Sequence, residues 1–353
     1  MKYIIKPIVI LIFLLLTIAF IPINTVNVHA ESSNTELIKY EGKVFHIFFH
    51  SLIINPELAF NSPKAEGYND WMTTKDEFLE ILPLLYRNDF ILIDIASLII
   101  KDTNGSIKKA DLYLPKGKKP LIISLDDVNY YQYMKGHGFA EKLIQDKNGE
   151  ITTCVNNNGR MTTSSNGDII PIIDHFVSIH PDFSFKGAKG IIAVTGYEGV
   201  FGYRTTSLSG DELVKATKEA TQIAKQLKAT GWRIASHSYS HSGKFRDSNI
   251  TLDQLKNDTN KWKSQIEPIV GNTSIYISPF GMPLKATDER MKYLNLQGYY
   301  IYCPVGKDMN LNYSSNVMIE ERLNFDGYSY LKDPKRIKKY FFDPAIFIDA
   351  QRP

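Results

Sequence analysis

The sequence predicts an α/β protein in which strands and helices alternate around a parallel sheet or barrel. Short apolar runs recur along the chain, and several of the segments between them carry apolar residues at helical spacing. The run at 120–125 is apolar apart from Ser124, which is typical of a strand buried on both faces. We find no internal repeat and no linker of low complexity.

In the N-terminal half, we expect strands at 44–50, 90–95 and 120–125, and helices at 75–87 and 169–179. The helix at 75–87 has Phe78, Leu82 and Leu85 on one side. Asp76 and Glu77 suit its first turn, where carboxylates interact favourably with the helix dipole.

In the C-terminal half, we expect strands at 190–195, 232–236, 274–278 and 299–303, and helices at 211–230, 252–266 and 288–296. Gly231 follows the longest of these helices and is a favourable residue at a helix C-terminus. The last apolar run, at 345–348, is expected to be a strand.

Residues 129–168 break the alternation. They contain three tyrosines, Tyr130, Tyr131 and Tyr133, and two Gly-ending polar clusters at 156–159 and 164–167. We expect a long loop, and a long loop in a compact domain is usually functional or disordered. A second Gly-rich segment, at 196–204, is not followed directly by a helix in phosphate-binding spacing, so a nucleotide site is not indicated.

The N-terminus has the layout of a secretory signal peptide. Lys2 and Lys6 precede an apolar run at 8–21, and Ala30 stands at a suitable cleavage position. The run is short for a membrane span; the alternative is an uncleaved anchor that contacts the membrane through 8–21. In either case the protein is expected to be secreted or to lie on the extracellular face of the cell envelope.

Charge and cysteine content exclude several classes of protein. The chain has 353 residues with 41 Lys and Arg against 38 Asp and Glu, a net charge of +3. Residues 1–30 contain two lysines and no acid, so removing them leaves 39 against 38, or +1. A nearly neutral protein is a poor candidate for nucleic-acid binding. Cys154 and Cys303 are too few for a disulfide scaffold or a four-cysteine zinc site, and we expect two unpaired thiols.

Two motifs carry candidate chemistry. Asp126 and Asp127 follow the buried strand at 120–125, at the edge where parallel α/β folds place their sites. His237 and His241 follow the strand at 232–236, and histidines at i and i+4 on one helical turn can reach one metal ion. Each pair alone could be ordinary surface residues. Together they offer two imidazoles and a carboxylate, a ligand set that leaves positions open for water and substrate and suits hydrolysis.

These motifs resemble those of the polysaccharide deacetylase family, carbohydrate esterase family 4, also called the NodB-homology domain. The segment 124–127, Ser-Leu-Asp-Asp, resembles the family's Thr-Phe-Asp-Asp motif, and 237–241 matches its His-Ser/Thr-x-x-His motif. Pro279, Phe280 and Gly281 resemble its Pro-Tyr-Gly groove motif. The motifs span roughly 120–303, and the likeness extends back to the strand that ends at His50.

The resemblance implies a distorted (β/α) barrel of about seven strands with loop insertions, rather than the usual eight strands. It implies that Asp127, His237 and His241 bind a divalent metal, commonly Zn²⁺, and that Asp126 is the general base. The chain would then divide into a signal peptide or anchor at 1–30, a polar extension at 31–43 and a catalytic domain at 44–353.

The chain departs from the family pattern at the general acid and at an arginine. No histidine follows His241, where the family places its acid. We take His50 as the candidate acid, with a buried structural role as the alternative and Asp349 as a weaker candidate. Arg204 is our candidate for the arginine that holds the base, and Arg322 is a weaker one.

Substrate contacts are expected from Pro279, Phe280, Gly281, Arg204 and Tyr239. Tyr239, like the tyrosines at 130–133, could stack on sugar faces, or it could simply pack in the core.

The function these observations indicate is removal of N-acetyl groups from an extracellular or cell-wall polysaccharide, such as peptidoglycan or poly-N-acetylglucosamine. Two alternatives remain open at this point. One is a glycan-binding member of the same fold without catalysis, and the other is a metal hydrolase of a different amide or ester.

Overall fold

The computed structural model describes residues 36–157 and 159–353. The predicted signal peptide at 1–30, with its apolar run at 8–21, and residues 31–35 of the predicted extension lie outside the described residues. Within the described part of the chain, no helix is both long and apolar enough to cross a membrane.

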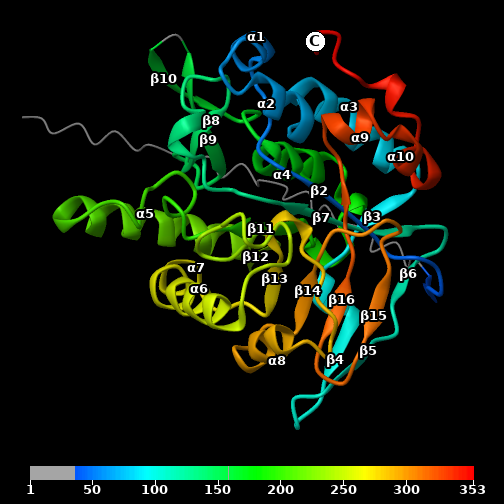
Figure 1. Cartoon of the computed structure of the whole chain (residues 1–353). Helices are drawn as coiled ribbons and strands as arrows, with labels where there is room; N and C mark the ends of the chain where they lie inside the picture. The colour runs from blue at the N-terminus through cyan, green and yellow to red at the C-terminus, as the bar shows by residue number, and fades with distance from the viewer. Residues whose placement is uncertain (1–35, 158) are drawn as a thin grey trace, which may run out of the picture. The chain divides into compact units, whose positions relative to one another are not determined.

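A parallel sheet forms the centre of the fold (Figure 1). Seven of its strands follow one another in space, and each pairs in parallel with the next. In spatial order they are β2 (Phe45–Phe49), β7 (Lys119–Leu125), β11 (Gly190–Val194), β12 (Trp232–Ser236), β13 (Ile275–Ile277), β14 (Ile301–Cys303) and β16 (Met318–Glu320).

The two edges of this sheet are joined by one stretch of chain. β17 (Leu323–Asn324) pairs in parallel with β2, at the opposite end of the sheet from β16. Only Glu321 and Arg322 separate β16 from β17, and Arg322 forms a further parallel bridge to Val305. The segment from β16 to β17 therefore acts as one interrupted strand that closes the sheet. This confirms the predicted (β/α) barrel of about seven strands.

Helices surround the barrel. Figure 1 shows α6 and α7 beside β12 and β13, with α3, α9 and α10 grouped on another side. Within the described residues, the helices are α1 (Pro56–Phe60), α2 (Ala65–Trp71), α3 (Lys75–Arg87), α4 (Ile169–Ile179), α5 (Gly210–Ala229), α6 (Leu252–Gln265), α7 (Glu267–Val270), α8 (Glu289–Leu296), α9 (Gly327–Leu331) and α10 (Pro334–Tyr340).

Helix α3 shows how the sequence sets these elements. The Thr74 side chain accepts a hydrogen bond from the backbone N–H of Glu77, and the Glu77 carboxylate accepts one from the backbone N–H of Thr74. This capping box satisfies two donors at the helix start. Phe78, Leu82 and Leu85 are buried on one side of the helix, as predicted.

The strands bury both faces. Alternate residues of β7, such as Leu121 and Ile123, pack into the cluster that includes the helix residue Phe78. Ile122 belongs to a second cluster, which also takes residues from β11, β12, β13, β14 and β16 and so fills the barrel interior. Ser124 lies on the same side of β7 as Ile122, two residues closer to the carboxyl end. The interior therefore changes from apolar to polar towards that end.

Residues 129–168 differ from the expected long loop. They form an antiparallel sheet of β8 (Ala140–Gln145), β9 (Ile151–Asn157) and β10 (Arg160–Ser164). Asn157 at the end of β9 pairs with Arg160 at the start of β10, so the polar cluster that ends in Gly159 is a hairpin signal. Leu143, Ile151 and Val155 join the main core, which is why the segment folds onto the domain.

The run at 345–348 is not a strand. Pro344–Ile346 forms a 3₁₀ helix, because Asp343 caps it and Pro344 suits its first position. The segment that closes the barrel is instead the short stretch from β16 to β17.

The remaining strands lie at the edges of the barrel or in small ribbons. β3 (Phe90–Leu92) pairs with the start of β7, and β15 (Leu311–Tyr313) pairs antiparallel with β16. The two small ribbons are β1 (Leu37–Lys39) with β6 (Tyr113–Pro115), and β4 (Ile99–Lys101) with β5 (Ile107–Lys109).

A candidate metal centre at the mouth of the barrel

Asp126 and Asp127 lie directly after β7, at the carboxyl ends of the parallel strands. The backbone N–H of Asp126 donates to the carbonyl of Phe49 on β2 (2.8 Å). Asp127 has φ = 58°, a left-handed conformation that is uncommon outside glycine. Adjacent residues of a regular strand point to opposite faces, and this turn of the backbone lets both carboxylates reach the same mouth.

His237 follows β12 and is almost fully buried. Its Nδ1 forms a hydrogen bond of 2.8 Å with the carbonyl oxygen of Ile277, and must donate it. That bond leaves Nε2 as the free ring atom, 3.9 Å from Oδ2 of Asp126. Burial lowers the pKa of His237 against the opposing effect of Asp126 and Asp127, so the imidazole is kept neutral, as a metal ligand requires.

His241 approaches from a loop rather than from the helical turn that we expected. Residues 237–241 have no helical assignment, and Ser238 and His241 have φ values of 62° and 45°. Asp258 on α6 holds this loop by accepting hydrogen bonds from the backbone N–H groups of Tyr239 (2.7 Å) and Ser240 (2.9 Å). Nε2 of His241 then lies 3.8 Å from Oδ2 of Asp127.

The three expected ligands converge. One donor atom each from Asp127, His237 and His241 lie within 4.8 Å of one another. Zinc–ligand distances of 2.0–2.2 Å put two ligands of a tetrahedral site about 3.4 Å apart, so short side-chain shifts bring these atoms into coordinating positions. Two imidazoles and a carboxylate fit a divalent metal ion. The hydrogen bond from Nδ1 of His237 to the Ile277 carbonyl also fixes the tautomer that leaves Nε2 free for the metal.

Both carboxylates are kept ionised. Burial acts to raise the pKa of Asp127, but the attraction of His241, His237 and His50 and a hydrogen bond from Tyr131 outweigh it and lower the pKa to about 2. Burial also opposes ionisation of Asp126, yet Arg322, His237 and His50 lower its pKa below the usual value. Asp126 is therefore available as a proton acceptor at neutral pH.

The arginine that holds Asp126 is Arg322, not Arg204. Nη1 of Arg322 donates to Oδ1 of Asp126 at 2.7 Å, and both side chains are buried. Arg204 pairs instead with Glu198 (3.0 Å) and donates to the backbone carbonyls of Asn129 and Tyr130. The weaker of the two sequence candidates thus occupies the expected position.

His50 lies next to the same mouth. It follows the last residue of β2 and interacts electrostatically with Asp126, Asp127 and Asp326. Its Nδ1 is buried and has no hydrogen-bond partner among the described residues. The other acid candidate, Asp349, lies elsewhere, since its backbone N–H donates to Glu77 (3.2 Å).

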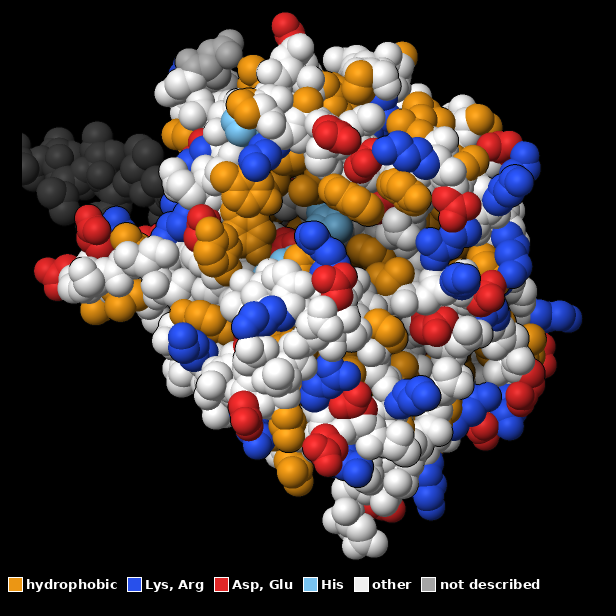
Figure 2. Space-filling view, in the orientation of Figure 1, with side chains coloured by type: hydrophobic (Ala, Val, Ile, Leu, Met, Phe, Trp, Pro, Cys, Tyr) orange, Lys and Arg blue, Asp and Glu red, His pale blue; other side chains and the backbone are white. Residues whose placement is uncertain are grey.

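Aromatic residues border the site. Figure 2 shows a hollow where histidine and acidic side chains are visible among hydrophobic ones. The turn Pro279–Gly281 places the Phe280 ring 4.4 Å from the ring of His241, with Phe280 39% exposed. Tyr131 stacks on Tyr133 (5.7 Å) and lies near Tyr197 (5.6 Å), and the latter two are about half exposed.

The tyrosines divide into packing residues and site residues. The Tyr130 hydroxyl is buried and donates to Asp168 (2.7 Å). The Tyr239 hydroxyl donates to Gln265 (2.7 Å), and its ring covers Gly196 so closely that a Cβ there would lie 2.0 Å from it. Tyr131 donates to Oδ1 of Asp127 (2.5 Å). Sequence reasoning missed this role, although the tyrosine stands only four residues after the aspartate.

Comparisons with known proteins place the chain near solved deacetylase structures, at low identity. IcaB from Ammonifex degensii is 12% identical with a TM-score of 0.43, over 81% of this chain and 93% of that one. The deacetylase PplD of Streptococcus pyogenes, in complex with acetate, is 11% identical with a TM-score of 0.44, over 84% and 99%. The BpsB deacetylase domain from Bordetella bronchiseptica is 10% identical with a TM-score of 0.41, over 80% and 96%.

No protein-family model matches the chain, and no curated protein does. The geometry of the site itself is therefore what indicates the function.

Proposed function

We propose that this chain is a metal-dependent N-deacetylase, a divergent polysaccharide deacetylase acting on an N-acetylglucosamine-containing glycan outside the cell. The observation that supports the proposal best is the convergence of Asp127, His237 and His241 within 4.8 Å, beside Asp126, whose carboxylate is paired with Arg322. A hydrolytic metal site needs these parts: ligands that leave open positions, and a separate base.

Asp127, His237 and His241 would hold the metal ion, for which Zn²⁺ is the best match to a set of two imidazoles and one carboxylate. A divalent ion bound there would supply Lewis acidity, polarising the acetamide carbonyl and making a nearby water more acidic. Tyr131 would orient the first ligand through its bond to Asp127, and the Ile277 carbonyl would orient the second through Nδ1 of His237.

Asp126 and His50 would divide the proton transfers. Oδ1 of Asp126 accepts from Arg322, so Oδ2, which faces His237, is the atom that takes the proton from the attacking water. His50 would then protonate the leaving nitrogen, because it lies close to both carboxylates. The acetamide C–N bond breaks, and the products are acetate and the free sugar amine.

The glycan would lie along the aromatic border of the hollow. Exposed faces of Tyr133, Tyr197 and Phe280 suit the apolar faces of sugar rings. Pro279 and Gly281 shape the turn that carries Phe280, while Tyr239 and Arg204 would support the loops beside the site rather than touch substrate. We place the catalytic domain at 44–353 and the protein outside the cell, delivered by the segment 1–30 or anchored through 8–21.

The test measures acetate released by the purified protein from N-acetylchitopentaose and from peptidoglycan. We expect release that a chelator abolishes and added Zn²⁺ restores, and a loss of about 10²- to 10⁴-fold in Asp126→Asn, as for removal of a general base. Asp253→Asn is the matched control, because this carboxylate is exposed on α6 and its change should leave the rate unaltered.

Three results would overturn the proposal. Glycan binding without acetate release would indicate a non-catalytic glycan-binding protein. Chelator-sensitive turnover of simple esters or amides, but of no glycan, would indicate a different metal hydrolase. Acetate release that neither chelator nor Asp126→Asn affects would remove the site from the reaction.

A further inference from the structure

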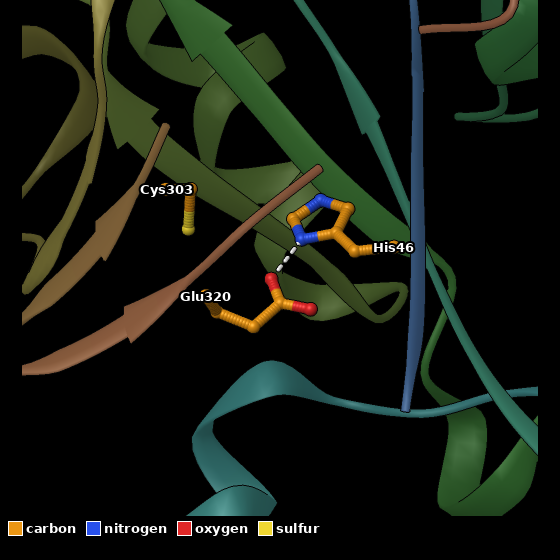
Figure 3. A group of neighbouring side chains, drawn as sticks. All are labelled: His46, Cys303 and Glu320. Carbon is orange, nitrogen blue, oxygen red and sulfur yellow. Dashed lines mark hydrogen bonds and ion pairs between the residues drawn. The ribbon is translucent and has the colours of Figure 1, made fainter. Parts of the chain in front are cut away.

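A line of polar side chains runs through the barrel interior below Asp126. Nη1 of Arg322 donates to Oδ1 of Asp126 (2.7 Å) and to Oγ of Ser124 (3.1 Å). The same Ser124 oxygen forms a hydrogen bond with Nε2 of His46 (2.9 Å), and Nδ1 of His46 pairs with a carboxylate oxygen of Glu320. Figure 3 shows the His46 ring and the Glu320 carboxylate pointing towards one another, with Cys303 beside them.

This line consists of two side-chain pairs, His46 with Glu320 and Arg322 with Asp126, joined by the Ser124 hydroxyl. His46, Ser124, Glu320 and Arg322 are all fully buried. The imidazole of His46 faces the carboxylate of Glu320, and the guanidinium of Arg322 is paired with the carboxylate of Asp126. Buried charges are tolerated when they are paired in this way. Among the described residues, the hydrogen bonds that connect the two pairs are those of Ser124.

Arg322 depends on Ser124 for its orientation. Its Nε and Nη2 have no hydrogen-bond partner within the described residues, so Nη1 carries both of its polar side-chain contacts. The Phe48 ring, 4.2 Å from the guanidinium carbon, confines the group from one face but does not fix its rotation in that plane. A second anchor beside Asp126 is what defines where Nη1 points.

We propose that Ser124, His46 and Glu320 are positioning residues that fix Arg322 and, through it, the orientation of Asp126. This inference rests on the proposed role of Asp126 as general base. The residues act from three strands: His46 from β2, Ser124 from β7 and Glu320 from β16. The line therefore spans the point where β16 and β17 close the barrel onto β2.

A metal site at His46, Cys303 and Glu320 is the competing interpretation, because donor atoms of these residues also lie within 4.8 Å of one another. Two observations favour the hydrogen-bonded line. Both ring nitrogens of His46 already have partners, and burial raises the pKa of the Cys303 thiol well above its usual value, which disfavours a thiolate ligand.

The decisive variant is Ser124→Ala, which removes one hydroxyl but keeps the Arg322 and Asp126 side chains themselves unchanged. We expect kcat to fall about tenfold, with KM and metal content unchanged, because a misoriented base affects the chemical step alone. Ser124→Thr retains a hydroxyl on the same carbon and should recover most of the loss. Thr153→Ala is the matched control, since it removes a buried hydroxyl that donates to the Ser164 carbonyl (2.8 Å) far from the line.

A double-mutant cycle on stability tests the line independently of catalysis. Ser124→Ala and Arg322→Met should be non-additive by more than about threefold in the unfolding equilibrium constant, because they remove partners of one network. If the wild-type protein deacetylates nothing, the proposed function fails. The double-mutant cycle still measures the interaction between Ser124 and Arg322.

Three results would overturn the inference: wild-type kcat in Ser124→Ala, additive stability changes, or a second equivalent of bound zinc that Cys303→Ser abolishes.

Discussion

Replacing Arg322 with Met tests how the barrel keeps a buried base ionised. The methionine fills much of the arginine's volume but carries no charge, so Asp126 loses its nearest cation, 2.7 Å away. With charge centres about 4 Å apart and an effective dielectric constant of about 20, the lost attraction is at most about 4 kcal/mol. Neither side chain is exposed enough for solvent to replace it, since exposure is 0% for Arg322 and 5% for Asp126.

The sign of the pH effect follows from the direction of the Asp126 pKa. In the wild type this pKa is lowered against the effect of burial, with Arg322 as the strongest opposing influence. The ion pair therefore stabilises the fold above the unfolded pKa of Asp126, and this contribution disappears as the pH falls through the folded one. In Arg322→Met burial is opposed only by histidines, so the pKa rises.

Two assays measure the consequence. The acid limb of the pH profile of kcat/KM should move upward by more than about one pH unit, since about 1.4 kcal/mol corresponds to each unit. Urea unfolding at pH 7 should show a loss of up to about 4 kcal/mol, the attraction worked out above, and the deficit should shrink in acid. Arg233→Met is the control, because Arg233 lies near the amino end of β12, opposite the barrel mouth, and pairs with the partly exposed Asp94. An acid limb that stays in place, with a stability loss below about 1 kcal/mol, would refute the reasoning.

Three further predictions concern residues around the site and the end of the chain. Tyr131→Phe removes the hydroxyl that donates to Asp127, so the pKa of Asp127 should rise and zinc affinity, measured by competition with a chromophoric chelator, should fall about 10- to 100-fold. Arg352→Met leaves the buried carboxylate of Glu77 without its cation, and should lower the free energy of unfolding by about 3–5 kcal/mol, much of which Glu77→Gln in the same chain should restore. Arg204→Ala should lower turnover of a chito-oligosaccharide, because Arg204 holds the backbone that follows Asp127; unchanged turnover would contradict this.

The strand ends could be predicted from the sequence, and with them the neighbourhood of the site. Asp126 and His237 each follow a short apolar run, and parallel strands bring their carboxyl ends to one edge. The local backbone could not be predicted in the same way. Asp127, Ser238 and His241 all adopt left-handed conformations, which no propensity assigns to these residues, and tertiary bonds such as those from Asp258 maintain them.

Arg322 was hard to predict for a different reason. It lies 196 residues from Asp126 along the chain, in a two-residue gap between strands of three and two residues. Such short strands carry almost no periodic signal. The strand expected at 345–348 favours Asp349 instead, and the hairpin at Gly159 gives only a weak signal because its flanking strands are mostly polar.

The interrupted strand that closes the barrel also comes later in the chain than all the other barrel strands. All three proposed metal ligands are made before residue 245, whereas Arg322 belongs to the last tenth of the chain. A chain emerging N-terminus first could gather its metal ligands while Asp126 still lacks its counter-ion and its anchor. Metal binding and catalytic competence would then be separate events during synthesis of the protein.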